Sequence, residues 1–242
     1  PLQMLLINVS QNVTLAQEKD TVSVAIEEKE PKEPFEFYLH SIRVGGDISY
    51  LILMGFNGNL VRYEANSEFN FSNRFILTAD VGYSDITSVP ETLEFEYKNT
   101  GFYARVGLDY NLMHNKFKDN AIFIGLRYGQ ANFEHNLRYK LDTSSVWINT
   151  PQDFVKSEKG MKVSWVEFTT GLRVRVWKSF YTGYTLRVQF RTSLKDGEVI
   201  SANELPGFGN NTNTSNLRFN YHIFYQLPFG RNSKKIKPES LE

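Results

Sequence analysis

Residues 216–229 read Asn-Leu-Arg-Phe-Asn-Tyr-His-Ile-Phe-Tyr-Gln-Leu-Pro-Phe, and this stretch decides the fold. Up to Leu227, apolar and aromatic side chains take every second position and polar ones take the positions between, with Phe224 as the exception. Successive side chains of a strand point to opposite faces, so the alternation predicts a long strand and argues against an amphipathic helix. We interpret it as the strand that closes a transmembrane β-barrel. Its predicted lipid-facing side chains are Leu217, Phe219, Tyr221, Ile223, Tyr225 and Leu227.

Seven further segments show the same alternation, which makes eight strands. They cover about 38–51, 60–69, 75–84, 93–111, 121–139, 162–176 and 180–193. The phase changes near Asn99–Gly101, which indicates a β-bulge, and again before Phe133. Short and long connections alternate as in outer-membrane barrels, except that the connection 51–58 is short where a long one is expected. The sequence therefore predicts an all-β fold, an eight-stranded antiparallel up-and-down transmembrane β-barrel over residues 38–229.

The composition argues against several other classes of protein. The chain has 242 residues, a formal net charge of zero and no cysteine. Nucleic-acid binding, a disulfide framework, thiol catalysis and cysteine-based metal sites are therefore not expected. No apolar run reaches the length of about 18 residues that a transmembrane helix needs. Barrel strands escape this test because only every second residue faces lipid.

The polar faces of the predicted strands are rich in arginine and carboxylates and hold almost no lysine. Arginine pairs bidentately with carboxylates and tolerates burial better than lysine, so we expect the polar faces inside the barrel. An eight-stranded barrel is filled by its own side chains, which predicts a plugged lumen. A soluble lipocalin-like barrel, with apolar faces inward around a ligand, and a gated ion path remain alternatives. The predicted interior polar network is Arg43, Asp47, Arg62, Glu64, Asp80, Arg105, Asp109, Arg127, Glu167, Arg173, Arg187, Arg218 and His222.

The segments outside the strands suggest how the chain is organised. Residues 1–16 resemble the remnant of a signal peptide, and residues 17–37 form a charged, proline-punctuated stretch typical of a flexible periplasmic linker. Residues 230–242 form a basic C-terminal tail. The polar loops Lys140–Gly160 and Leu194–Ser215 are the longest connections, and we expect any functional specificity there.

No motif indicates a catalytic, cofactor-binding or metal-binding site. The four histidines show no metal-ligand spacing, and His222 is interpreted as a structural interior residue. His135, with Glu134 beside it, lies where a strand nears an outer loop, and Ser164 or Ser193 is a candidate partner at the same height. A histidine with a serine at the rim would suit a lipid-modifying enzyme. We expect no cofactor, and we interpret the glycines of 205–209 as loop residues.

Several segments together resemble a known family. They are Ile42–Asp47, Phe71–Phe75, Phe123–Gly129, Trp165–Phe168 and Leu205–Phe208. Their order and spacing resemble the small outer-membrane β-barrel proteins of Bacteroidota that share a domain of unknown function. The resemblance implies an eight-stranded fold and an outer-membrane location in a Gram-negative bacterium, and it carries no catalytic residues. The basic tail after Phe229 departs from barrels that end on an aromatic residue.

The sequence therefore predicts a non-enzymatic, integral outer-membrane β-barrel with a plugged polar lumen. It would act in envelope structure or as a subunit of a larger outer-membrane complex. The expected partners are outer-membrane lipid and other envelope proteins, reached through outer loops or periplasmic tails, and no nucleic acid is expected. The alternatives are an outer-membrane lipid-modifying enzyme, of the lipid A hydrolase or acyltransferase type, and a soluble lipocalin-like ligand-binding barrel.

Overall fold

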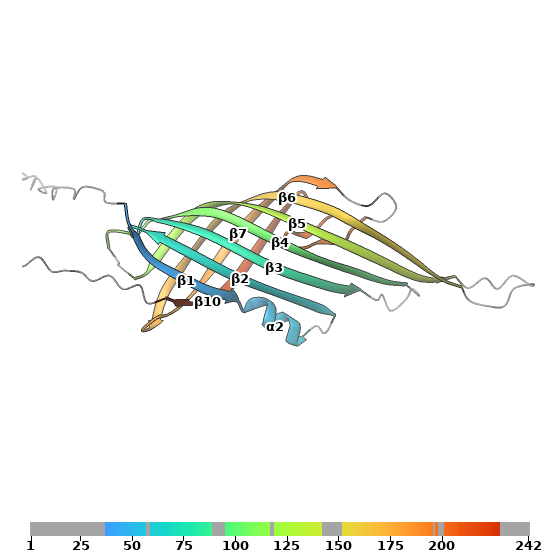
Figure 1. Cartoon of the computed structure of the whole chain (residues 1–242), viewed down its shortest axis with the longest axis horizontal. Coiled ribbons are helices and arrows are strands. Elements are labelled where there is room, and N and C mark those ends of the chain that lie inside the picture. The colour runs from blue at the N-terminus through green and yellow to red at the C-terminus, as the bar shows by residue number, and fades with distance from the viewer. Residues whose placement is uncertain are drawn as a thin grey trace, which may run out of the picture. The chain divides into compact units, whose positions relative to one another are not determined.

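Eight strands form a closed antiparallel barrel (Figure 1) in the order β1-β10-β7-β6-β5-β4-β3-β2. The computed structural model describes residues 37–56, 59–88, 95–116, 119–141, 152–195, 197 and 201–227. Successive barrel strands pair with each other, and the first strand, β1, closes the ring by pairing with the last, β10. The prediction of an eight-stranded up-and-down barrel is therefore confirmed. The strands are β1 (Leu39–Asp47), β2 (Leu60–Phe71), β3 (Phe75–Ser88), β4 (Phe95–Asn111), β5 (Ala121–Leu141), β6 (Gln152–Trp177), β7 (Phe180–Lys195) and β10 (Ser215–Gln226).

The two ends of the barrel differ in how the strands are joined. Tight turns connect β2 to β3 and β6 to β7, and Asn73 and Lys178 adopt positive φ angles of 55° and 43° there. We call this the turn end, and the opposite end, which carries the connections from β1 to β2 and from β7 to β10, the loop end. The predicted signal remnant, nearly all of the linker and the basic tail lie outside the described residues.

The first predicted strand is wrong beyond Asp47, because a helix follows it. Helix α2 (Ser49–Phe56) occupies most of the connection that seemed too short. The Asp47 carboxylate accepts hydrogen bonds from the backbone N–H of Ser49 at 2.8 Å and from its hydroxyl at 2.5 Å. Such a side-chain-to-backbone bond turns the chain and competes with continued strand pairing. Among the described residues, no helix is long and apolar enough to cross a membrane.

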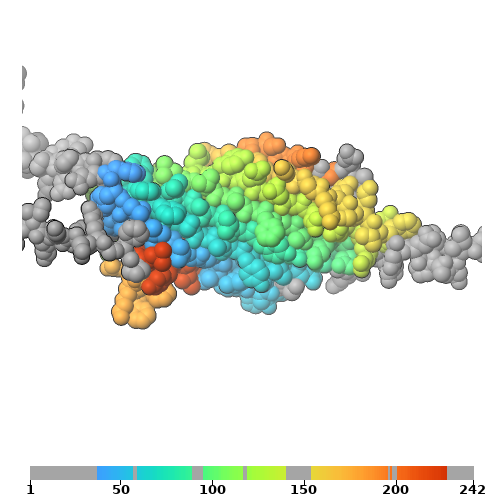
Figure 2. Space-filling model, viewed as in Figure 1, coloured from blue at the N-terminus to red at the C-terminus, as the bar shows by residue number. Residues whose placement is uncertain are grey.

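Helix α2 covers a gap in the barrel wall. β1 pairs with β10 only as far as Asp47 and with β2 only as far as Gly46, so the loop-end parts of β10 and β2 lack a β1 neighbour. The backbone N–H of Ile48 donates to the Tyr221 carbonyl at 2.9 Å, which anchors the chain entering the helix to β10. Figure 2 shows α2, in light blue, as a ridge on the outside of the strands. The gap is thus closed by a helix rather than by a strand.

The predicted bulge near Asn99–Gly101 is wrong. Pairing of β4 with both neighbours runs through these residues without a shift. The phase seemed to change because Tyr97 and Phe133 turn their rings inward, where they are buried, while the apolar residues nearer the turn end face outward. The irregularity of this region lies instead between β5 and β6, between Phe133 and His135.

Both long loops predicted from the sequence contain strand structure. β6 begins at Gln152, so the part of the Lys140–Gly160 loop from 152 onward belongs to a strand. β5 and β6 consequently project well beyond the other strands at the loop end (Figure 1). The loop Leu194–Ser215 contains a small two-stranded sheet, formed by β8 (Glu204–Leu205) and β9 (Gly209–Asn210).

Candidate functional site

The lumen holds a network of buried charges. Among the described residues, six arginines and six carboxylates are buried, and no lysine is. Opposite charges are therefore present in equal number, as the cost of burying charge requires. These residues are Arg43, Arg62, Arg105, Arg127, Arg173 and Arg187, with Asp47, Glu64, Glu68, Asp80, Asp109 and Glu167.

Toward the turn end, Glu68 joins two arginines. Its Oε2 lies 3.0 Å from Arg43 Nη1, and its Oε1 lies 2.8 Å from Arg173 Nε. Arg173 also donates to the hydroxyl of Thr185 at 3.1 Å. Three strands, β1, β2 and β6, thus meet at one carboxylate, which links distant parts of the wall across the lumen.

In the middle of the lumen, Arg127 and Arg105 share the carboxylate of Asp80. Arg127 Nη1 lies 3.0 Å from Asp80 Oδ2, and Arg105 Nε lies 3.2 Å from the same oxygen. Arg127 also reaches Asp109 at 2.7 Å, and Arg105 pairs with Glu64. Because each arginine carries five donors in a planar fork, it can bridge two carboxylates at once.

Toward the loop end, aromatic and amide side chains complete the network. Trp165 Nε1 donates to Glu167 Oε1 at 2.6 Å, and Gln189 donates to the same oxygen at 2.7 Å. The hydroxyl of Tyr103 donates to Glu64 Oε2 at 2.8 Å. The polar interior therefore passes directly into an apolar layer built on the rings of Tyr103 and Trp165.

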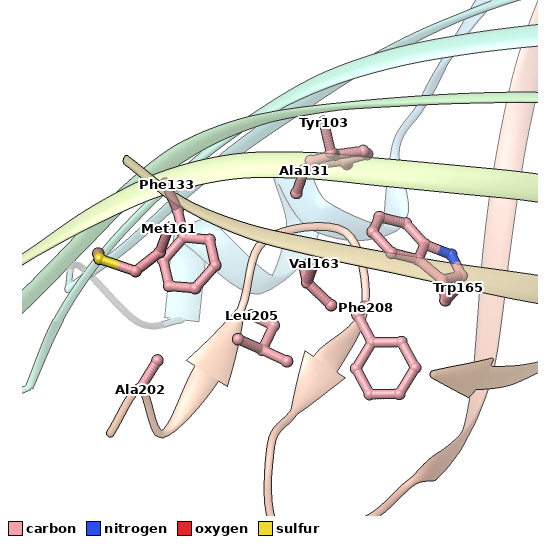
Figure 3. Packing of buried hydrophobic residues seen from close by; sticks show 9 residues of the cluster. All are labelled: Tyr103, Ala131, Phe133, Met161, Val163, Trp165, Ala202, Leu205 and Phe208. Carbon is pink, nitrogen blue, oxygen red and sulfur yellow. The ribbon is translucent and has the colours of Figure 1, made fainter. Parts of the chain in front are cut away.

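The segment 202–211, which carries β8 and β9, plugs the loop end. Leu205 and Phe208 are fully buried, and in Figure 3 they lie close to Val163 and Trp165 of β6. The side chain of Glu204 pairs with Arg62 at 2.6 Å, so the plug is also tied to the charge network. We therefore call residues 202–211 the plug segment. The sequence analysis interpreted the glycines of this segment as loop residues and did not predict that it packs inside the barrel. The full buried cluster is Tyr103, Ala131, Phe133, Met161, Val163, Trp165, Ala202, Leu205 and Phe208.

The structure places twelve of the thirteen predicted network residues among the buried side chains of the barrel. The thirteenth, Arg218, retains 17% side-chain exposure, and its guanidinium donates to the Tyr50 hydroxyl at 2.6 Å. The predicted network omitted Glu68, although this residue shares the polar face of β2 with Glu64. It also omitted Asn66, Tyr103, Trp165, Gln189 and Glu204. The sequence does place these aromatic and amide residues at alternate positions of their strands. That pattern alone does not show which of them point into the lumen and join the network.

His135 is not brought together with either candidate serine. Its two ring nitrogens face the Tyr97 hydroxyl at 3.3 Å and Glu158 at 3.2 Å, and the residue is fully buried. Ser164 lies opposite Gln130 and Ser193 in the sheet, not opposite His135. The arrangement around His135 is a buried hydrogen-bonded group rather than a nucleophile with its base.

One group of side chains in the lumen has the composition of a metal site. Ligand atoms of Asp47, Glu64 and His222 all lie within 4.8 Å of one another, and all three residues are buried. They come from the consecutive strands β1 and β2 and from the distant strand β10, which meet where β1 ends.

Comparisons with known proteins match one family model and include a distant solved structure. A family model described as "Domain of unknown function (DUF6048)" matches residues 2–232. No curated protein matches the chain. The crystal structure of Acinetobacter baumannii CarO2 is similar over 78% of this chain and all of that chain, with 8% sequence identity and a TM-score of 0.40. A likeness of this size assigns no function.

Proposed function

Given that the chain belongs to the family described as domain of unknown function (DUF6048), we propose that it is a non-enzymatic, integral outer-membrane β-barrel protein with a closed lumen. The observation that carries this proposal is the belt of exposed apolar side chains around the barrel. A water-soluble monomer rarely exposes an apolar surface of this extent, whereas the lipid-facing side of a membrane barrel needs one.

The belt has sharp limits along the strands. On the outward face of β5, Ile122, Ile124, Leu126 and Tyr128 are exposed and apolar, and from Gln130 onward that face is polar. On β4, every outward residue from Phe102 to Tyr110 is apolar or aromatic. This stretch matches the roughly 9–11 tilted residues that cross a bilayer. The parts of β4 to β6 nearer the loop end would then stand in water.

Aromatic pairs border the belt on both sides. Near the turn end, Phe75 packs against Tyr110 with ring centroids 5.5 Å apart, and Phe180 packs against Tyr225 at 5.3 Å. Nearer the loop end, Tyr83 packs against Phe102 at 4.9 Å. Girdles of aromatic side chains at two levels are typical of membrane barrels, because such rings favour the lipid–water interface.

The interior supports a structural rather than a conducting role. The balanced charge network and the plug segment support a lumen filled by side chains, whereas a lipocalin-like barrel would need an apolar interior. The grooves of about 750 and 630 Å³ are lined largely by outward residues, where lipid chains would lie. We propose a role in envelope structure or as a subunit of a larger outer-membrane complex, through the projecting end of β5 and β6.

Membrane insertion and closure can be tested with purified protein. We expect the chain to fold into lipid vesicles, to migrate differently on gels before and after boiling, and to give no conductance steps in planar bilayers. A stable monomer in detergent-free buffer would contradict the membrane assignment, and regular conductance steps would contradict the closed lumen.

The absence of enzymatic activity is tested separately. We expect lipid A and phospholipid mass spectra of a deletion strain to equal those of the parent strain, because His135 is engaged by Tyr97 and Glu158. A lipid species that disappears on deletion and returns with the wild-type gene but not with His135→Ala would show a lipid-modifying enzyme.

A further inference from the structure

One buried carboxylate of the lumen lacks a basic partner. Asp47 is 3% exposed, and among the described residues no arginine, lysine or histidine nitrogen lies within 4.0 Å of it. The other five buried carboxylates each contact at least one arginine. The Asp47 carboxylate accepts hydrogen bonds only from uncharged groups, namely Ser49 and the side-chain amide of Asn220. A buried carboxylate without a basic partner is costly to keep ionised, so a bound cation beside Asp47 would stabilise its charged form.

His222 is poised beside Asp47 with a free ring nitrogen. The two residues are opposite each other in the pairing of β1 with β10, and His222 is 1% exposed. Nδ1 of His222 lies 3.1 Å from Oδ1 of Asn66, whose amide nitrogen donates to Glu64 and Asp80. Because the Asn66 oxygen must accept, Nδ1 carries the proton, and Nε2 keeps its lone pair. Nε2 has no hydrogen-bond partner in the described structure.

We propose that Asp47, Glu64 and His222 bind one divalent transition-metal ion of the Zn²⁺ class inside the lumen. One imidazole nitrogen with two carboxylates is a donor set that such ions accept, whereas Mg²⁺ and Ca²⁺ prefer oxygen alone. A metal-bound histidine usually donates its other ring N–H to an oxygen, as His222 does to Asn66. The ion supplies the positive charge that Asp47 lacks. The sequence showed no metal-binding motif here, because the three proposed ligands come from three different strands.

The three ligands are not equivalent. Glu64 already pairs with Arg105 and, at 3.4 Å, with Arg187, so its charge is largely compensated. Asp47 accepts only from the uncharged Ser49 and Asn220, and Nε2 of His222 has no partner among the described residues. We therefore infer that Asp47 and His222 dominate the affinity and that Glu64 contributes less. The site does not depend on the membrane assignment, since it lies wholly within the barrel.

The test is Zn²⁺ binding by tag-free, chelator-treated protein, measured by calorimetry and elemental analysis. We expect one Zn²⁺ per chain and at least a tenfold loss of affinity in Asp47→Asn and in His222→Asn. Asparagine at 222 can still donate to Asn66 as Nδ1 does, but it removes Nε2. Glu68→Gln is the matched control, because Glu68 is an equally buried carboxylate whose partners are Arg43 and Arg173, and its affinity should stay within twofold of wild type.

Three results would overturn the proposal. They are no bound Zn²⁺ in the wild-type protein, unchanged affinity in both ligand variants, and nitrogen NMR shifts that show His222 as a doubly protonated imidazolium with and without Zn²⁺. Heat-modifiable migration verifies that each variant folds, and His222→Asn decides alone if Asp47→Asn does not fold. A membrane barrel that binds no Zn²⁺ refutes only the site, whereas a Zn²⁺-binding protein that stays soluble without detergent refutes only the membrane assignment.

Discussion

At the residue scale, the interior charges act as bridges between strands rather than as isolated pairs. Asp80 of β3 accepts from Arg127 at 3.0 Å and from Arg105 at 3.2 Å, and its other oxygen accepts from Asn66 at 2.8 Å. Removing one member therefore leaves several buried groups unsatisfied, which costs more than the pair itself contributes.

Asp80→Asn should destabilise the barrel strongly. Loss of a charge from a buried pair typically costs about 3–5 kcal/mol, because the partner is left buried without compensation. The control is Asp85→Asn, whose partner Lys98 is 45% exposed at 3.1 Å, and which should cost about 0–1 kcal/mol. Urea unfolding in lipid vesicles measures both. Equal small losses would contradict the view that the network holds the lumen together.

Gly207→Ala should loosen the plug segment. Gly207 has a φ of 74°, and a Cβ there would lie 2.6 Å from Cγ of Tyr103. Gly160→Ala is a matched control, since its φ is 77° but no atom lies within 4 Å of the added Cβ. Both changes carry the left-handed strain of about 1–2 kcal/mol, and only Gly207→Ala adds a clash. Protease cleavage within 202–211 should become faster in Gly207→Ala alone, and equal rates would refute the packing.

At the scale of elements, two short segments complete what eight strands leave open. Helix α2 covers the gap beside β1, and the Tyr50 ring lies under the guanidinium of Arg62, with 4.8 Å from Cζ to the ring centroid. The plug segment covers the loop end through Leu205 and Phe208. Both place side chains from outside the barrel strands against the barrel interior.

Replacing the plug segment by a glycine–serine linker should expose Trp165 without opening a channel. Trp165 is fully buried under Phe208, with ring centroids 6.0 Å apart, so its fluorescence should shift to longer wavelength. The ion-pair network below it should still block ions. The same replacement in a Trp165→Phe background should show no shift, which identifies the source. If the variant conducts ions, the plug segment rather than the ion-pair network is what blocks their passage.

At the scale of the whole molecule, the barrel has a polar inside and an apolar outside. This is the reverse of a soluble protein, in which apolar side chains gather in the core. The reversal is the rule within the belt, although Ile76, Phe123 and Phe224 are buried on the inside. It ends where the outward face of β5 turns polar at Gln130. If the barrel lies in a membrane as proposed, the limits of the belt define which part of it contacts lipid.

Leu126→Arg should destabilise the barrel in lipid by about 2–4 kcal/mol, the cost of an arginine near the bilayer midplane. Leu126 is 51% exposed on the outward face of β5. Asn132→Arg, on the same face of the same strand but outside the belt, should cost about 0–1 kcal/mol as a change near or beyond the interface. Folding equilibria in vesicles measure the difference. Equal costs at the two positions would mean that the belt does not face lipid.

Much of the fold could be predicted from the sequence, because strand faces are encoded locally. A period of two assigns side chains to faces without knowledge of any partner, and the lack of lysine on the polar faces shows which face is enclosed. Eight strands, their order and the interior position of residues such as Arg105 and Glu167 follow from this pattern. The end of β1 does not, because Ile48–Phe56 is apolar at nearly every position and fits a strand or a helix alike.

Only the tertiary structure decided which residues meet across the lumen. The stagger of the strands brings Glu68 close to Arg173, and Asp47 close to Glu64 and His222. These residues lie on different strands, so no local sequence pattern predicts that they meet. The inward rings of Tyr97 and Phe133 and the folded plug segment also depend on space left at one end of the barrel. The sequence by itself determined the faces of Asn216–Phe229 and of the other strands, because periodicity is local. The partners inside depended on closure of the ring, because closure alone sets the register across it.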